Sequence, residues 1–293
     1  MKSNDSDKRA ARADKPTTLP GQLHVIATPI GNLGDISRRA IELLCSVDTV
    51  LCEDTRSSQT LIRHIGSERP LQALHEHNER AQVPQLIERM QAGAQLALIS
   101  DAGTPLISDP GYRLVAAAHA AQIRVSPVPG PSATMAALSA AGLATDRFCF
   151  EGFLPAKTAA RRAQLTDLAA EPRTLVFFEA PHRVAETLED MRDAFGPERA
   201  AVLARELTKT FETVIHTDLA ELCERVRGDS NQCRGEIVLV IAGAPAVEGE
   251  AALIQARKLY DALAAELPPS RAAKLAAKIH GVNRRDLYQV EHG

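Results

Sequence analysis

Short apolar segments alternate with longer amphipathic segments in the first half of the chain, a pattern typical of an α/β domain. Residues 23–28 (LHVIAT) predict a strand, and apolar positions at helical spacing in 37–47 predict the helix that follows it. The same reasoning predicts strands at 48–52, 71–74, 96–99 and 124–128, and an alanine-rich helix at 112–121. We therefore expect an N-terminal α/β domain at 21–145 with a mainly parallel sheet.

The pattern starts again near residue 146. Apolar runs predict strands at 148–154, 173–179, 200–207, 211–217 and 234–242. The close spacing of 200–207 and 211–217 favours a hairpin, so we expect a second α/β domain at 146–245 with a mixed sheet. Helices are expected at 250–267, 270–280 and 283–290, as a small helical extension covering 250–293. Residues 1–20 have no apolar periodicity and are expected to form a disordered tail.

Composition narrows the class of protein. A net charge of -3 argues against a protein that coats naked DNA or RNA through global positive charge, and an aromatic content of 3% argues against an extended base-stacking surface. No apolar run is long enough to span a membrane, and the N-terminus lacks the apolar centre of a signal peptide. The five cysteines form no CxxC pair, so we expect reduced thiols in a cytoplasmic protein.

The most polar loop, SDAGTPLISDPG at 100–111, follows a predicted parallel strand, where ligands of open sheets usually bind. Gly103 permits a close approach of the backbone to a ligand, and Asp109 is expected to cap the helix that follows. A second rigid loop, VPGPS at 128–132, ends in Ser132 as a helix cap. Either loop alone is common, but two at one sheet edge favour a cofactor cradle.

Other polar segments leave alternatives open. EDTR at 53–56 is either a ligand-facing strand end or a solvated turn, and HEHNE at 75–79 is expected to be a polar substrate-facing loop or a surface turn. Its two histidines have no third ligand at a recognisable spacing, so a metal site is not expected. The basic residues of 270–290 form either a phosphate-contacting helix-turn-helix or a solvated helical cap.

The chain resembles the tetrapyrrole methylase superfamily, the class III S-adenosylmethionine methyltransferases. The likeness covers 22–243 and rests on an ordered series of motifs: ATPIGNLGDIS (27–37), CEDTR (52–56), SDAGTPLISDPG (100–111), VPGPSA (128–133), FEAPHR (178–183), RELTKTFE (205–212) and RGEIV (234–238). Tetrapyrrole-modifying members carry GxGPGD and GDP loops where this chain has TPIGNLGD and SDAGTP. Both departures match the branch that methylates ribosomal RNA.

The resemblance implies a homodimer of two-domain subunits that hold S-adenosylmethionine in a cleft. It also implies methyl transfer to the ribose 2′-oxygen of a decoding-centre cytidine in 16S rRNA, within the small ribosomal subunit. One alternative is the same fold acting on a tetrapyrrole or another small metabolite. An alternative of another class is a non-catalytic ribosome-associated RNA-binding protein.

Site residues are assigned on the matching motifs. Cofactor binding is expected from Pro29, Asp101, Gly103, Thr104, Ser108, Ser132, Ala133, Phe178 and Pro181. The candidates for a catalytic base are Glu206, Lys209 and Glu212, with Glu53 and Asp54 as the other choice. Substrate contacts are expected from Glu53, Asp54, Arg56, His77, His182 and Arg183.

Overall fold

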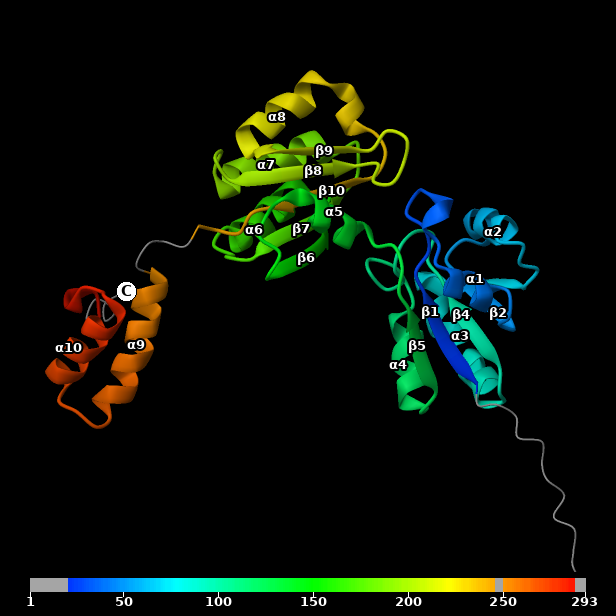
Figure 1. The fold of residues 1–293 in the computed structure, drawn as a ribbon, viewed down its shortest axis with the longest axis horizontal. Coiled ribbons are helices and arrows are strands. Elements are labelled where there is room, and N and C mark those ends of the chain that lie inside the picture. Colours follow the sequence, from blue (N-terminus) through cyan, green and yellow to red (C-terminus); the bar gives the residue numbers. More distant parts are fainter. Residues whose placement is uncertain (1–20, 246–249, 288–293) are drawn as a thin grey trace, which may run out of the picture. The chain divides into compact units, whose positions relative to one another are not determined.

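The computed structural model describes residues 21–245 and 250–287. It contains two five-stranded sheets with their helices, followed by a helical extension (Figure 1). The chain divides into two compact units: the first runs to Ala141 and also includes Ala204–Val214 and Gly235–Val238, and the second contains the rest. The tail expected at 1–20 lies outside the described residues.

The first sheet has the strand order β3-β2-β4-β1-β5, and its recorded pairings are parallel. The strands are β1 (Gln22–Ile26), β2 (Thr49–Cys52), β3 (Leu71–Ala73), β4 (Gln95–Leu98) and β5 (Arg124–Val128). The prediction of a parallel sheet is therefore confirmed. All five strands deliver the loops at their carboxyl ends to one edge of the sheet.

The first sheet is covered on both faces because successive side chains of a strand point to opposite sides. Leu96 and Leu98 of β4 belong to one buried cluster with residues of α3 and α4, whereas Ala97 and Ile99 belong to another with residues of α1. The helices of this unit are α1 (Arg38–Leu44), α2 (Thr55–His64), α3 (Glu76–Gln91), α4 (Tyr112–Ala120) and α5 (Ala133–Ala141), with a 3₁₀ turn η1 (Leu33–Asp35). This packing fixes the strands and leaves their loops free to form a site.

Helix α3 corrects one expectation. The polar loop predicted at 75–79 is wrong, because His75 is the N-cap and Glu76 begins the helix. The Oδ1 atom of Asn78 accepts a hydrogen bond from the His75 amide at 2.9 Å, which closes a capping box. Pro84 lies inside this helix, where the sequence alone suggests a break.

The second sheet has the order β6-β7-β10-β8-β9 and is mixed, as predicted. Its strands are β6 (Phe148–Phe153), β7 (Thr174–Glu179), β8 (Ala200–Arg205), β9 (Thr213–Asp218) and β10 (Ile237–Ile241). Its helices are α6 (Thr158–Leu168), α7 (Val184–Phe195) and α8 (Leu219–Gly228), with the 3₁₀ turn η2 (Ser230–Cys233). The fold class expected from the sequence is confirmed for both sheets.

A buried ion pair joins α6 to α7. Arg161 is 1% exposed, and its Nε donates to Asp190 Oδ2 at 2.6 Å. Arg162 Nε donates to the other oxygen of Asp190, also at 2.6 Å. Burial alone would raise the pKa of Asp190, but the hydrogen bonds from the two arginines outweigh it, and the pKa is lowered. The carboxylate is therefore held charged between the helices.

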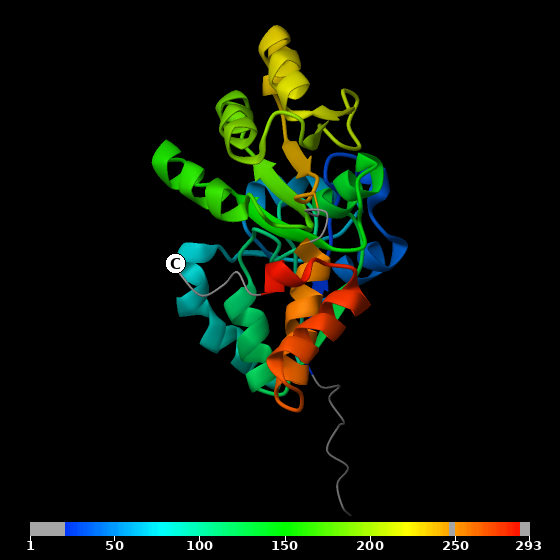
Figure 2. The same cartoon turned by 90° about the vertical axis from the view of Figure 1, so that its left-hand side faces the viewer.

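The helical extension consists of α9 (Glu250–Ala264), α10 (Pro269–His280) and the 3₁₀ turn η3 (Arg284–Leu287). Helices α9 and α10 lie side by side in both views (Figures 1 and 2). The helix expected at 270–280 begins one residue earlier, since Pro268 is the N-cap and α10 begins with Pro269, whose ring suits the first helical turn. The helix ends at His280, as expected, because Gly281 adopts the left-handed conformation (φ 68°).

The helix expected at 283–290 is a short 3₁₀ turn, and positions 288–290 lie outside the described residues. No helix within 21–245 or 250–287 is both long enough and apolar enough to cross a bilayer.

Candidate functional site

Three loops at the carboxyl edge of the first sheet are joined by hydrogen bonds. The Thr28 amide donates to the Gly103 carbonyl at 2.9 Å, and the Gly103 amide donates back to the Thr28 carbonyl at 3.1 Å. The Thr104 hydroxyl donates to the Pro131 carbonyl at 3.0 Å. The loops after β1, β4 and β5 are therefore held together at this edge.

Two glycines allow this close approach. Gly103 has a φ of 83°, and a Cβ there would lie 3.3 Å from Ile30 Cγ2. A Cβ at Gly130 would lie 3.1 Å from the Cβ of Ala27. Side chains at these positions would push the loops apart.

The loop after β4 stores backbone strain. Leu106 and Ser108 adopt the left-handed region, with φ values of 73° and 67°. This region costs of order 1–3 kcal/mol for residues other than glycine and persists where the surrounding structure enforces it. Strain of this kind is concentrated at ligand-binding loops, which agrees with the position of Ser108 among the predicted cofactor residues.

Acidic side chains from two strand ends gather at this edge. Asp101 Oδ1 accepts a hydrogen bond from the Ser57 hydroxyl at 2.6 Å, which ties the loop after β4 to the start of α2. Burial raises the pKa of Glu53, and the charge of Asp101 adds to the effect. Burial likewise raises the pKa of Asp109 to about 6, assisted by the charges of Glu53 and Asp101 and opposed by a hydrogen bond with Ser100.

Asp109 is the functional candidate that sequence reasoning missed. It was expected to cap α4, but the N-cap is Gly111, with no side-chain cap hydrogen bond. The helix begins two residues later than an Asp109 cap requires, and the carboxyl group interacts with Ser100 instead. A signal was available: the loop contains Ser-Asp-x-Gly twice, at 100–103 and 108–111, and only its first aspartate was assigned to the cofactor.

Two residues of the EDTR segment, Asp54 and Arg56, have a structural role at the start of α2. Asp54 is the N-cap of α2 and accepts a hydrogen bond from the Arg56 amide at 2.8 Å. The Arg56 guanidinium also pairs with Asp54, at 3.1 Å, and the side-chain hydrogen bond from Arg56 lowers the pKa of Asp54. The exposed guanidinium of Arg56 retains free donors for a phosphate.

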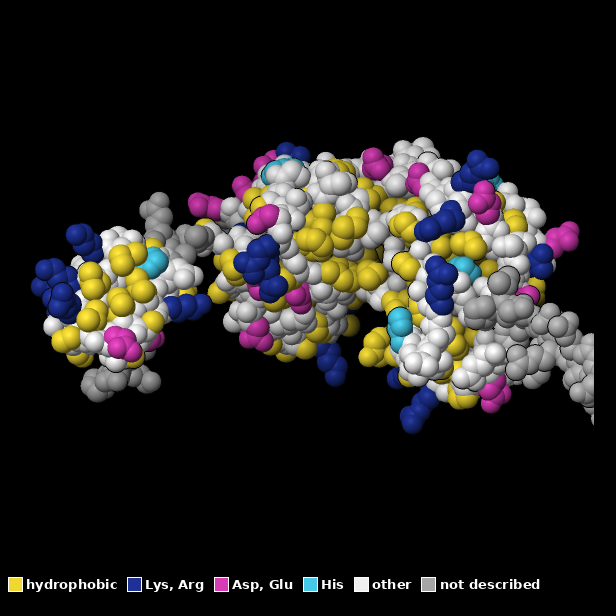
Figure 3. Space-filling model, turned by 60° about the horizontal axis from the view of Figure 1, so that its bottom comes forward, with side chains coloured by type: hydrophobic (Ala, Val, Ile, Leu, Met, Phe, Trp, Pro, Cys, Tyr) yellow, Lys and Arg dark blue, Asp and Glu magenta, His cyan; other side chains and the backbone are white. Residues whose placement is uncertain are grey.

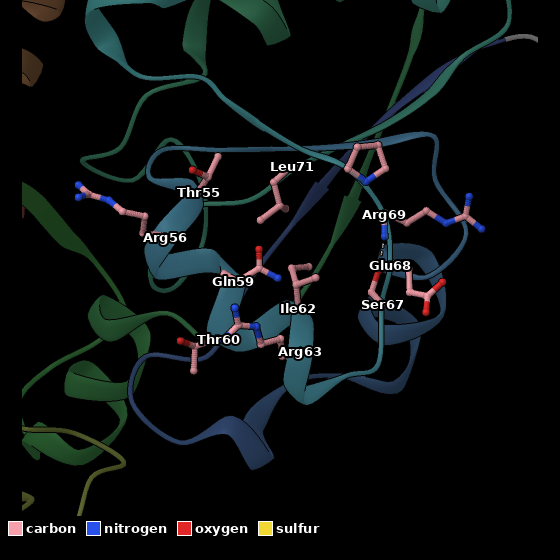
Figure 4. A pocket seen from close by; sticks show the side chains of 11 residues that line it. Thr55, Arg56, Gln59, Thr60, Ile62, Arg63, Ser67, Glu68, Arg69 and Leu71 are labelled. Carbon is pink, nitrogen blue, oxygen red and sulfur yellow. Dashed lines mark hydrogen bonds between the residues drawn. The ribbon is translucent and has the colours of Figure 1, made fainter.

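A groove of roughly 730 Å³ runs along α2 toward β3. Figure 4 shows Arg56 at one end and Arg69 at the other, with their guanidinium groups pointing away from each other. Ile62 and Leu71 lie between them. Arg56 and Arg69 therefore do not converge on one ligand position, and we assign no cofactor to this groove.

The candidate base residues lie in a loop whose side chains bind one another. Lys209 Nζ donates to Glu206 Oε1 at 2.8 Å and to Glu236 Oε2 at 3.0 Å. The hydrogen bond from Lys209 lowers the pKa of Glu206. Burial opposes the charge of Lys209, but its two carboxylate partners raise its pKa. Glu212 accepts a hydrogen bond from the Thr208 amide at 2.6 Å.

The same loop, which belongs to the first unit, lies against the loop after β1. A Cβ at Gly31 would lie 2.4 Å from Lys209 Cγ, so the lysine stem covers this glycine. Glu206 and Thr208 both have positive φ, at 52° and 67°. The structure thus brings Lys209 to the segment that contains Pro29, although the sequence separates them by 180 positions.

Four predicted site residues belong to the second unit. Phe178 contacts Phe150 and Phe153 edge to face, with ring centroids 4.8 and 5.6 Å apart. Pro181 is half-buried and His182 is exposed. Arg183 donates to the Leu154 carbonyl at 2.8 Å, so part of its guanidinium holds the chain after β6. Their contacts with a ligand stay predictions, as does that of exposed His77 in the first turn of α3.

Within the part of the chain that the structure describes, no group of three His, Cys, Asp or Glu side chains could hold a metal ion. The rings of His75 and His77 lie 6.0 Å apart, edge to face.

Family models match most of the chain. The model described as tetrapyrrole (corrin/porphyrin) methylases matches 22–223, and the one described as the RsmI C-terminal HTH domain matches 250–290. The chain is 59% identical over 270 residues to the ribosomal RNA small subunit methyltransferase I of Pseudomonas aeruginosa, covering 92% of this chain and 96% of that protein. It is 51% identical to the protein of the same name from Escherichia coli O157:H7, covering 92% and 94%.

Solved structures share the fold. A uroporphyrin-III C-methyltransferase from Thermus thermophilus superposes with a TM-score of 0.54 at 20% identity, covering 78% of this chain and 98% of that chain. A structure of the Thermus thermophilus enzyme complexed with S-adenyl homocysteine superposes with a TM-score of 0.53 at 18% identity, covering 76% and 97%. At these identities the likeness concerns the fold.

Proposed function

Because the chain belongs to the tetrapyrrole methylase family and is a methyltransferase of small-subunit ribosomal RNA that uses S-adenosylmethionine, we propose that it methylates the ribose 2′-hydroxyl of a decoding-centre cytidine. The observation that carries the proposal is the 59% identity over 92% of the chain. The joined loops after β1, β4 and β5 supply the cofactor site.

The residues at this edge fit S-adenosylmethionine. The cofactor is a nucleoside with ribose hydroxyls, an ammonium group, a carboxylate and a sulfonium cation, and when bound it supplies an electrophilic methyl group. Asp101, which is exposed, and Glu53 offer carboxylate oxygens to hydroxyl and cationic groups. The first turn of α5, after Ser132, offers backbone amides and the partnerless buried hydroxyl of Thr134.

We assign Asp109 as the base that accepts the proton of the ribose hydroxyl. Asp109 lies on the same loop as Asp101 and Ser108, beside the cofactor residues. A pKa of about 6 leaves its carboxylate ionised at neutral pH and close to the range that suits a general base. Methyl transfer to oxygen is an in-line displacement, so the other loop residues act mainly by alignment.

Lys209 and Glu206 then serve as positioning residues. A base must be free to take a proton, but Lys209 is held as an ammonium by two carboxylates and Glu206 is held as a carboxylate by Lys209. Their ion pairs fix the Glu206–Glu212 segment over Gly31. This keeps the loop after β1 in place beneath the reacting groups.

The other two functions are less well supported. A tetrapyrrole substrate is suggested by the description of the family model and by structures of 18–20% identity, whereas relatives of 47–59% identity carry the ribosomal RNA name. A non-catalytic binding protein would not need the strained loop or its ionisable carboxylates. We further propose that the enzyme acts as a homodimer in the cytoplasm, where small subunits are assembled; gel filtration with light scattering tests the dimer.

The function is tested with purified protein, labelled S-adenosylmethionine and small subunits from cells that lack this methylation. Digestion to nucleosides should place the label on the 2′-oxygen of one cytidine. Label on a base, or transfer to a tetrapyrrole in a parallel reaction, would contradict the proposal.

Replacing Asp101 with asparagine should weaken cofactor binding roughly tenfold, because a charge-assisted contact of about 1.5–3 kcal/mol becomes neutral. Calorimetry with S-adenosylmethionine measures the change. The Ser57→Ala variant is the matched control, since it removes the 2.6 Å partner of Asp101 while keeping its charge. Equal affinity in Asp101→Asn and the parent protein would remove Asp101 from the cofactor site.

A further inference from the structure

The exposed face of α10 combines cations with aliphatic side chains. Ala272, Ala273, Ala276 and Ala277 are buried within the helical extension. The opposite side of the same helix is exposed, and its residues recur at helical spacing: Arg271, Lys274, Leu275, Lys278 and Ile279. Leu275 and Ile279 are 37% and 63% exposed, so this face is not simply a solvated polar surface. We call these five residues the α10 face.

The charge of the α10 face contrasts with that of the whole protein. The chain has a net charge of -3, yet α10 contains three Lys or Arg residues and no Asp or Glu. In Figure 3, Lys and Arg side chains gather beside exposed hydrophobic side chains on the helical extension at the left. Such a face complements a polyanion whose backbone also presents apolar sugar edges.

We propose that the α10 face binds the phosphate backbone of the small-subunit ribosomal RNA and holds the enzyme on its substrate. The inference rests on the proposed function, because that function supplies an RNA partner. Arg271, Lys274 and Lys278 contact phosphates, and Leu275 and Ile279 pack against ribose carbons. The match of 250–290 to a helix-turn-helix model agrees with this role.

A lipid surface fits this face less well. An interfacial helix inserts a broad apolar side into the membrane, with its cations at the rim. Here the alanine side of α10 is already buried against α9 and η3, so α10 itself offers two exposed aliphatic side chains, Leu275 and Ile279. RNA binding requires no rearrangement of the helix pair.

The test uses the full chain with Lys274→Gln and Lys278→Gln together, since glutamine preserves helix propensity. Binding to small subunits is measured over a series of salt concentrations. Losing two phosphate contacts should lower the magnitude of the slope of log affinity against log salt by about 1 to 2. The KM for subunits should rise roughly tenfold with kcat and cofactor affinity unchanged.

Two further variants separate the contributions. Leu275→Ala with Ile279→Ala should weaken binding by a similar factor at every salt concentration, because apolar contacts release no counterions. The matched control removes two exposed cations elsewhere, Arg124→Gln at the amino end of β5 and Lys258→Gln on α9, and should leave the slope unchanged.

An unchanged slope and KM in the Lys274→Gln, Lys278→Gln variant, with methyl transfer intact, would overturn the inference and leave the proposed function standing. Loss of methyl transfer in the parent protein would instead contradict the function itself. The last measurement is binding to phosphatidylglycerol vesicles. If the Lys274→Gln, Lys278→Gln variant lost binding to the vesicles but kept its affinity for small subunits, the α10 face would be assigned to lipid.

Discussion

Replacing Asp109 with asparagine is expected to lower kcat by a factor of about 10² to 10⁴, the contribution typical of a positioned general base. The amide keeps the size of the side chain but cannot accept the proton of the ribose hydroxyl. Single-turnover methyl transfer to small subunits measures the loss. Cofactor affinity, measured separately by calorimetry, should change by less than about tenfold.

The same substitution should stabilise the fold at neutral pH. Burial raises the pKa of Asp109 to about 6, above its ordinary value of 3.8, so its stability contribution is complete below pH 3.8 and is lost as the pH rises through 6. Asp109→Asn avoids the loss and should raise the free energy of unfolding at pH 7 by about 1 to 3 kcal/mol. The two proteins should be nearly equally stable near pH 4, and urea unfolding at both pH values tests the sign.

The pH dependence of the reaction gives an independent check. In the parent protein, kcat should increase with pH along a limb centred near 6, where Asp109 loses its proton. That limb should disappear in the residual activity of Asp109→Asn. Full activity of the variant with an unchanged pH profile would transfer the role to another carboxylate, with Glu53 the first to test.

Removing the carboxylate of Asp190 should destabilise the second unit by about 3 to 5 kcal/mol, the range for breaking a buried ion pair on one side. Asp190→Ala leaves the guanidinium of Arg161, which is 1% exposed, without its 2.6 Å partner. Urea unfolding followed by circular dichroism measures the change. A drop below about 1 kcal/mol would mean that this pair contributes no more than a surface pair.

Glu189→Ala is the matched control, on the neighbouring position of α7. Glu189 pairs with Arg227 at 2.7 Å, but both side chains are well exposed, at 40% and 46%. Solvent screens the pair, so its loss should cost less than about 1 kcal/mol. The contrast between adjacent carboxylates isolates the effect of burial.

The sequence was sufficient to predict the strands because parallel strands buried on both faces appear as short apolar runs, as in β4. The sequence did not predict α3, because histidine is a weak signal for a helix start at position 75 and proline is a weak signal for a helix interior at position 84. The loops after β4 and β5 were expected on one sheet edge, but the hydrogen bonds that join them to each other and to the loop after β1 depend on positions that no local pattern specifies.

The protonation states of the ionisable side chains at the site also could not be predicted from the sequence. Asp101 and Asp109 occupy similar Ser-Asp-x-Gly contexts, yet burial and the charges of Glu53 and Asp101 raise the pKa of Asp109 to about 6. Lys209 looks equally suitable as a base until its two carboxylate partners are located. Such differences arise from contacts between residues distant in the chain.

Two main-chain hydrogen bonds join Thr28 to Gly103, and the buried Thr28 hydroxyl adds hydrogen bonds to the carbonyls of Ser100 and Gly103. The two main-chain bonds do not depend on the side chain at position 28, where only proline would remove a donor. Position 103 is more restricted, because its φ of 83° favours glycine. Side chains of these loops that take no part in the joining contacts can therefore change while the main-chain bridge persists, so new substrate preferences can arise without rebuilding the architecture beneath them.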